Sequence, residues 1–222
     1  MNPDQWRTYL VTQESLSEGR STDEIVEQAI EGGVDAIQLR EKETGAESRY
    51  KLGERLRELT AEADVDLIVN DRVDIANAID ADGVHLGQSD LPISVARDQL
   101  GEDAIVGASV STVSEARLAA ITGADYLGVG AIYGTSSKPE APTADDGLGL
   151  DELANIVETV KIPVVAIGGI TPENAAATIQ AGASSVAVIS TITAADDPAA
   201  AARELRAAVD AEAVDAVEAD DD

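Results

Sequence analysis

Apolar residues recur along this chain in eight short runs rich in residues that favour strands. Several runs are almost continuously apolar, which is typical of strands buried on both faces of a parallel sheet. The segments between them carry helical patterning. The predicted strands are 8–12, 36–40, 66–70, 83–87, 104–110, 126–132, 164–169 and 185–190. Eight strands alternating with helices in 222 residues predict a single (β/α)₈ barrel.

The boundaries of the intervening helices are marked by capping residues. Ser21–Glu24 and Thr112–Glu115 have the form of a capping box, in which a hydroxyl and a carboxylate satisfy the first amides of a helix. Three prolines occupy positions typical of a first helical residue, and three glycines close helical stretches: Pro92, Pro172, Pro198, Gly32, Gly123 and Gly182.

An open, doubly wound sheet is the alternative fold. It would require a glycine-rich fingerprint after the first strand, and the segment there, "VTQESLSEG", has none. We expect one barrel domain over residues 1–210 and an acidic, frayed tail over 211–222. The stretch 133–150 is too long for an ordinary connection, so we expect it to be functional, with a flexible connection as the alternative.

Charge and composition narrow the class of protein. The chain has 43 acidic and 15 basic residues, a net charge of −28, and no phenylalanine. In molar salt the Debye length falls to about 3 Å, so such a surface repels itself little. We therefore expect a halophilic organism, with an ordinary acidic mesophile protein as the alternative. The sequence has no basic stripe, which argues against a nucleic-acid binder.

The sequence also excludes disulfides and several kinds of metal site, and it argues against a membrane or secreted protein. The chain has no cysteine and one histidine, His85, so disulfides, thiolate metal sites and poly-histidine metal sites are excluded. No apolar run approaches the roughly 20 residues of a membrane helix. The start, "MNPDQWRTYL", lacks the pattern of a signal peptide, so we expect a cytoplasmic protein.

The candidate chemistry lies at the carboxyl ends of the predicted strands, where barrel enzymes place their active sites. Along the second strand, Gln38, Arg40 and Lys42 alternate with Ile37, Leu39 and Glu41, so the two sets face opposite sides. Lys138 follows the sixth strand and adds a third cation. Three cations at one mouth of a strongly acidic protein favour a multiply charged anion such as a phosphate.

Two aspartates follow neighbouring strands. Asp71 and Asp90 could hold Mg²⁺ together with phosphate oxygens and water, which would make the anion a diphosphate. The alternative is that each only caps the helix that follows it. Gly168-Gly169 and the segment "VIST" resemble the second phosphate site of such barrels, although a tight turn would also explain the glycines.

Taken together, the motifs resemble the thiamine-phosphate synthase family. They are "QLREK", "VNDR", "DGVHLGQSD", "GASVST", "GADYLGVGAIYGTSSK", "AIGGIT" and "AGASSVAVIS", and they extend from about Tyr9 to about Ala201. The resemblance implies a transferase that joins a hydroxymethylpyrimidine diphosphate to a thiazole phosphate, or to its carboxythiazole form. Thiamine phosphate would be formed and pyrophosphate released. These small molecules are the expected partners, and the oligomeric state is left open, a homo-oligomer included.

The resemblance also implies roles for individual residues. Arg40, Lys42, Ser109 and Lys138 would be catalytic, and Asp71 and Asp90 would hold Mg²⁺. The pyrimidine diphosphate would be bound by Gln38, Leu39, Arg40, Glu41, Lys42, Asn70, Ser109 and Lys138. The thiazole phosphate would be bound by Thr135, Ser136, Ser137, Gly169, Ile189 and Ser190. Ser137 departs from the threonine frequent in the family but keeps the hydroxyl.

A dissociative mechanism suits this set of residues. An aminopyrimidine stabilises a methylene cation, so the bond to diphosphate can break before the thiazole nitrogen attacks, and no protein base is needed. We expect His85 inside the barrel or as a donor to another site residue. The rival interpretations are a thiazole tautomerase, which would not need the aspartates, and a non-catalytic sensor of thiazole phosphate. Phosphosugar isomerases are disfavoured because cysteine is absent.

Overall fold

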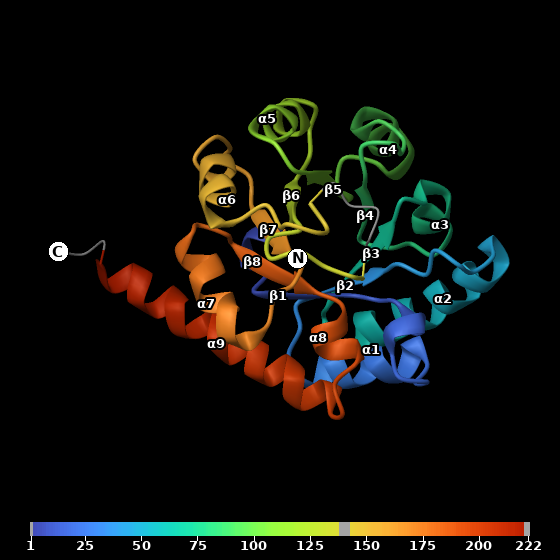
Figure 1. Ribbon diagram of the computed structural model, residues 1–222. Coiled ribbons are helices and arrows are strands. Elements are labelled where there is room, and N and C mark those ends of the chain that lie inside the picture. Colours follow the sequence, from blue (N-terminus) through green and yellow to red (C-terminus); the bar gives the residue numbers. More distant parts are fainter. Residues whose placement is uncertain (1, 138–142, 220–222) are drawn as a thin grey trace.

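The computed structural model describes residues 2–137 and 143–219, and its centre is a closed barrel of eight parallel strands (Figure 1). Each strand pairs with the next in sequence, and β8 pairs with β1. The strands are β1 Thr8–Val11, β2 Ala36–Leu39, β3 Asp66–Asn70, β4 Gly83–Leu86, β5 Ile105–Val110, β6 Tyr126–Gly130, β7 Val164–Ile167 and β8 Ser185–Val188. The predicted (β/α)₈ barrel is confirmed, and the open sheet is wrong.

Helices surround the barrel (Figure 1). They are α1 Thr22–Glu31, α2 Ala46–Ala63, α3 Val73–Ala78, α4 Ile93–Leu100, α5 Val113–Ile121, α6 Leu150–Val157, α7 Pro172–Gln180, α8 Ser190–Thr193 and α9 Pro198–Ala219, with short 3₁₀ turns η1 Pro3–Gln5 and η2 Glu14–Leu16. Helix α9 packs against α1 and α7 and continues past position 210 into the segment 211–222, where we expected a frayed tail. None of the helices in the described ranges is long and apolar enough to cross a membrane.

The predicted helix starts are largely as expected. Ser21 and Glu24 form both bonds of a capping box at α1. The Thr112 hydroxyl accepts a hydrogen bond from the Glu115 amide at 3.2 Å, but the Glu115 carboxylate accepts from the amide of Ser111 instead of Thr112. Pro172 and Pro198 begin α7 and α9, whereas Pro92 precedes α4 by one residue because its ψ is extended.

Two apolar layers hold the barrel together. Outward residues of the strands, such as Ile37 and Leu39, pack against the helices. Inward residues form a smaller interior cluster that includes Trp6, Tyr9 and Tyr126. The Trp6 indole donates to the Asp66 carboxylate at 2.8 Å. The aromatic cluster fills the barrel interior. The polar inward side chains lie above it, nearer the carboxyl ends of the strands, where barrels place their sites.

Candidate active site

A cavity of about 610 Å³ occupies the mouth of the barrel. It is lined by thirteen of the predicted site residues: Gln38, Arg40, Lys42, Asn70, Asp71, Asp90, Ser109, Thr135, Ser136, Ser137, Gly169, Ile189 and Ser190. They come from the ends of seven strands, β2 to β8, and the loops that follow. The topology therefore gathers residues more than 150 positions apart into one pocket. Lys138 lies outside the described residues.

The end of β2 presents its polar face to this cavity. Gln38 and Arg40 are 5% and 7% exposed. The Gln38 amide donates to the Tyr9 hydroxyl at 2.9 Å, and the Arg40 guanidinium donates to the Gln13 side-chain oxygen at 2.6 Å. The predicted alternation is confirmed, and hydrogen bonds hold these polar groups in position before any ligand binds.

The other face of the same segment has a structural role. Leu39 is fully buried between the barrel and the helices. The Glu41 carboxylate accepts from the Glu14 amide at 3.0 Å and from the Thr22 hydroxyl at 3.0 Å, which ties β2 to the starts of η2 and α1. Neither residue lines the mouth cavity, but Glu41 lines a hollow beside it together with Arg40 and Lys42. The binding roles of Leu39 and Glu41 stay predictions.

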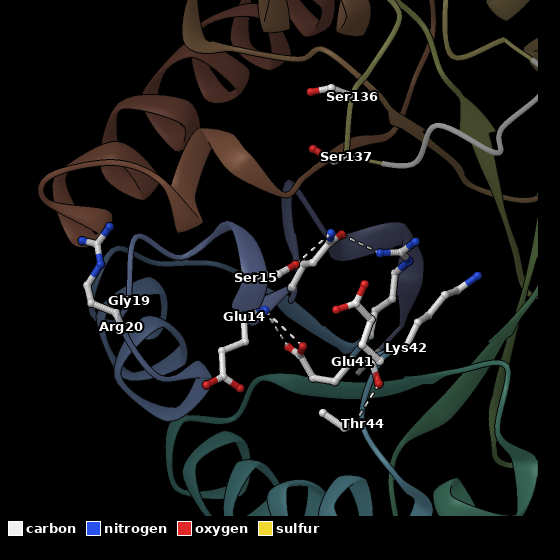
Figure 2. Close-up of a pocket in the computed structure, with 12 residues that line it drawn as sticks. Glu14, Ser15, Gly19, Arg20, Glu41, Lys42, Thr44, Ser136 and Ser137 are labelled. Carbon is white, nitrogen blue, oxygen red and sulfur yellow. Dashed lines mark hydrogen bonds between the residues drawn. The ribbon is translucent and has the colours of Figure 1, made fainter.

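A second hollow of about 690 Å³ lies beside the mouth (Figure 2). Four predicted site residues line both cavities: Arg40, Lys42, Ser136 and Ser137. Figure 2 shows the two serines on the opposite side of this hollow from Glu41 and Thr44. The cations of β2 therefore stand where the two spaces meet.

Asp71 and Asp90 face each other at the ends of β3 and β4. Burial raises the pKa of Asp71, and the hydrogen-bonded, negatively charged Asp90 raises it further, while Lys42 and Asn70 lower it. The Lys42 ammonium lies 3.7 Å from the Asp71 carboxylate. Two carboxylates held this close favour a bound cation or a shared proton.

The helix-cap alternative is wrong for both aspartates. Arg72 precedes α3 and Pro92 precedes α4, and neither helix start receives a hydrogen bond from a capping side chain. Asp71 adopts a left-handed φ of 64°, and the Asp90 carboxylate accepts from the Gly87 amide at 2.7 Å. Among the described residues, no third carboxylate, histidine or cysteine joins the pair in a metal-binding group.

The half of the mouth formed by β6, β7 and β8 is built from backbone. Gly168 and Gly169 have φ of 103° and 67°. A Cβ at Gly169 would lie 2.6 Å from the Gly134 carbonyl oxygen, and one at Gly168 would overlap Ala131. The glycines therefore do more than permit a turn, since they let the loop after β7 pack directly on the loop after β6.

Both neighbouring loops carry predicted binding residues. The Thr135 amide donates to the Ala144 carbonyl at 2.8 Å, and its hydroxyl accepts from the Ser137 amide at 3.1 Å. Ile189 stands at the start of α8, and Ser190 is its first residue. These residues bring hydroxyls and backbone amides to the side of the cavity opposite Asp71 and Asp90.

Sequence reasoning missed two buried residues. Tyr9 and Tyr126 meet inside the barrel, with hydroxyl oxygens 3.1 Å apart. His85 lies between Tyr126 and Ser109, at 2.9 Å and 2.8 Å, which confirms the expectation that it is an interior residue. The available signal was two tyrosines on inward positions of otherwise apolar strands. A hydroxyl buried there requires a partner.

Comparisons with known proteins identify relatives of this chain in sequence and in structure. The sequence model of a family described as thiamine monophosphate synthase matches residues 8–192. The thiamine-phosphate synthase of Haloarcula marismortui is 62% identical over 92% of this chain and 97% of its own. That of Natronomonas pharaonis is 59% identical over 91% and 94%. In structure, the thiamine phosphate pyrophosphorylase of Pyrococcus furiosus is similar, with a TM-score of 0.85, 42% identity, and coverage of 95% of this chain and 98% of that one.

Proposed function

The chain belongs to the thiamine-phosphate synthase family, whose members are transferases of thiamine biosynthesis, and we propose in detail how its mouth performs the reaction. The substrates are hydroxymethylpyrimidine diphosphate and a thiazole phosphate, with the carboxythiazole form included. The products are thiamine phosphate and pyrophosphate, and carbon dioxide is released as well when the carboxythiazole form reacts. The observation that carries the proposal is a single cavity with cations and paired carboxylates on one side and close-packed glycine loops on the other.

The diphosphate binds beside β2. Arg40 is held by Gln13 and offers a planar set of donors that suits phosphate oxygens, while Lys42 adds a mobile point charge. Gln38, Asn70 and Ser109 line the same side and contact the pyrimidine diphosphate. Lys138 joins them as a prediction from the family resemblance alone. Replacing Lys138 with alanine should then lower turnover far more than stability.

Asp71 and Asp90 fit a magnesium ion. Burial raises the pKa of Asp71, and the neighbouring Asp90 raises it further; a divalent cation would relieve the repulsion between the two carboxylates. Two protein carboxylates completed by phosphate oxygens and water are typical of Mg²⁺ sites. When bound, Mg²⁺ supplies electrostatic stabilisation of the negative charge on the diphosphate.

The thiazole phosphate binds on the opposite side. Hydroxyls of Thr135, Ser136, Ser137 and Ser190 line the cavity there, with backbone contributed by Gly169 and Ile189. Barrel enzymes commonly bind phosphate with the loops after their seventh and eighth strands. This placement sets the thiazole ring across the cavity from the diphosphate, so orientation supplies part of the catalysis.

The bond changes balance without a protein nucleophile or base. The carbon–oxygen bond between the pyrimidine methylene and the diphosphate breaks, its electron pair leaves with pyrophosphate, and the aminopyrimidine stabilises the cation. The lone pair of the thiazole nitrogen then forms the carbon–nitrogen bond. Arg40 and Lys42 stabilise the departing charge. The paired aspartates and the cations favour this reaction over a thiazole tautomerase, which needs neither.

A coupling assay in molar KCl tests the proposal. The protein is given both substrates with Mg²⁺ or with EDTA, and thiamine phosphate and pyrophosphate are both quantified. We expect equal amounts of the two products, and only with Mg²⁺. Arg55→Gln serves as a control variant because Arg55 pairs with Asp23 on the surface, away from the mouth. Binding of thiazole phosphate without any product would instead support a sensor.

A further inference from the structure

An unbroken chain of hydrogen bonds crosses the interior of the barrel. It runs from the Gln38 amide to the Tyr9 hydroxyl at 2.9 Å and on to the Tyr126 hydroxyl at 3.1 Å. From there it reaches His85 Nδ1 at 2.9 Å, and His85 Nε2 lies 2.8 Å from the Ser109 hydroxyl. All five residues line the mouth cavity, and Gln38 and Ser109 are the two ends of the hydrogen-bond chain. Two ligand-facing groups from β2 and β5 are thus connected through buried side chains.

The aromatic rings in this hydrogen-bond chain are buried and closely packed. Tyr9 and Tyr126 are 2% and 0% exposed. A Cβ at Gly107 would overlap the Tyr126 ring, and one at Gly128 would lie 2.8 Å from His85 Cε1. Two inward glycines on β5 and β6 therefore accommodate the two rings, which packing locks in place.

The donors in the chain have one consistent direction. Among the described residues, the Tyr9 hydroxyl contacts the Gln38 amide and the Tyr126 hydroxyl. Because the amide N–H donates to Tyr9, the Tyr9 proton has the Tyr126 oxygen as its acceptor. The Tyr126 proton is then directed to His85 Nδ1. A buried hydroxyl proton without an acceptor would cost about 1–3 kcal/mol, which disfavours any other order.

The direction determines what the far end offers to a ligand. With Nδ1 accepting, the neutral imidazole carries its proton on Nε2 and donates to the Ser109 oxygen. The Ser109 proton is then left to point into the cavity. If Gln38 were turned over, every donor would reverse, and Ser109 would present only lone pairs to its ligand. The Gln38 amide donates to Tyr9, which gives the first arrangement, and in it Ser109 can donate to an anionic ligand.

We propose that Tyr126 is a positioning residue, which holds His85 as the Nε2–H tautomer and so makes Ser109 a donor toward the pyrimidine diphosphate. The identity of that ligand rests on the proposed function, whereas the tautomer does not. Tyr126 touches no substrate in this scheme and acts only through His85 and Ser109. Tyr9 supports the same chain from the Gln38 end.

The tautomer can be measured directly because His85 is the only histidine in the chain. Long-range proton–nitrogen NMR correlations of ¹⁵N-labelled protein report which ring nitrogen carries the proton. We expect the Nε2–H form in the unmodified protein and in Tyr9→Phe, which leaves the Tyr126 donor intact. Tyr126→Phe should show a mixture or the other form. An Nδ1–H tautomer in the unmodified protein would overturn the proposal, whether or not the protein is active.

Kinetics separate positioning from simple packing. Tyr126→Phe should lower kcat by about tenfold, in line with a misdirected hydrogen bond in the site. Tyr9→Phe should mainly raise KM for the pyrimidine diphosphate, because Gln38 loses its partner. In a Ser109→Ala background Tyr126→Phe should have no further effect on kcat. Equal losses with and without Ser109 would mean a merely structural role and would reject the proposal, while thermal melts confirm that the variants are folded.

Discussion

The two halves of the mouth are built by different means. On the β2–β5 side, the site is made of side chains: Arg40 and Gln38 are buried and already hydrogen-bonded, and Asp71 faces Asp90. On the β6–β8 side it is made of backbone: Gly168 and Gly169 have left-handed φ and leave no room for a Cβ. One half places charges, and the other places a surface that fits closely.

This difference indicates how each half should respond to mutation. Charge-neutral replacements of similar size should damage the side-chain half without changing its shape, because its contribution is electrostatic. The backbone half should tolerate changes of surface polarity and fail when a methyl group is added, because its contribution is close approach. Each of the following variants challenges one half and compares it with the other.

The largest effect is expected from Arg40→Met, which removes a buried charge that faces the diphosphate. We expect kcat/KM for the pyrimidine diphosphate to fall by about 10²–10³-fold, the scale of losing one preorganised stabilising group. KM for thiazole phosphate should change little. Steady-state kinetics with each substrate varied provide the measurement, with Arg55→Gln as the control. A comparable rise in KM for both substrates would contradict the division of the mouth.

Asp90→Asn should weaken the metal dependence. We expect the Mg²⁺ concentration for half-maximal activity to rise at least about tenfold, because the neutral amide is a poorer ligand for a hard cation. The titration is made at saturating concentrations of both substrates. An unchanged Mg²⁺ titration would exclude the two-aspartate site.

Gly169→Ala tests the backbone half. The added methyl group would lie 2.6 Å from the Gly134 oxygen and would push the two loops apart. We expect KM for thiazole phosphate to rise about tenfold, which corresponds to the loss of about one hydrogen bond to the ligand. Gly149→Ala is a matched control: its φ is 81°, and a Cβ there meets nothing within 4 Å. Both should lose about 1–3 kcal/mol of stability from the strained backbone. Equal kinetic effects would mean that strain, not contact, matters.

The smallest effect concerns stability against pH. Burial and Asp90 raise the pKa of Asp71 in the folded protein, so the folded state binds this proton more tightly than the unfolded state. Stability from this group is therefore present below the ordinary aspartate pKa and is lost as pH rises through the raised value. Asp71→Asn should remove that slope, and asparagine suits the left-handed φ. In EDTA the variant should melt above the unmodified protein at pH 7; a lower melting temperature would count against the repulsion.

The barrel and most of its site were predictable from the sequence because both depend on short-range patterns. Runs of apolar residues indicate the strands, and alternation correctly separates Gln38 and Arg40 from Leu39 and Glu41. The motif "QLREK" alone does not separate these two pairs, because a contiguous motif does not tell which face of the strand each side chain lies on. Alternation therefore predicts which side chains face the mouth, while the binding roles that the motif implies for Leu39 and Glu41 stay predictions.

The rest depends on contacts between distant residues. No local pattern pairs Tyr9 with Tyr126 or assigns Gly107 to the space taken by the Tyr126 ring. The contact of Gly169 with Gly134 likewise joins two loops that only the closed barrel brings together. Lys138 falls outside the described residues and stays a prediction.

Calorimetric binding of each anion separately tests the division of the mouth most directly. Inorganic pyrophosphate and thiazole phosphate are titrated into the unmodified protein in molar KCl, each with Mg²⁺ and with EDTA. The account predicts that pyrophosphate binds only with Mg²⁺, whereas thiazole phosphate binds with the same affinity in both. Two results would contradict the division of the mouth: loss of thiazole phosphate binding in EDTA, or pyrophosphate binding with the same affinity in Mg²⁺ and in EDTA.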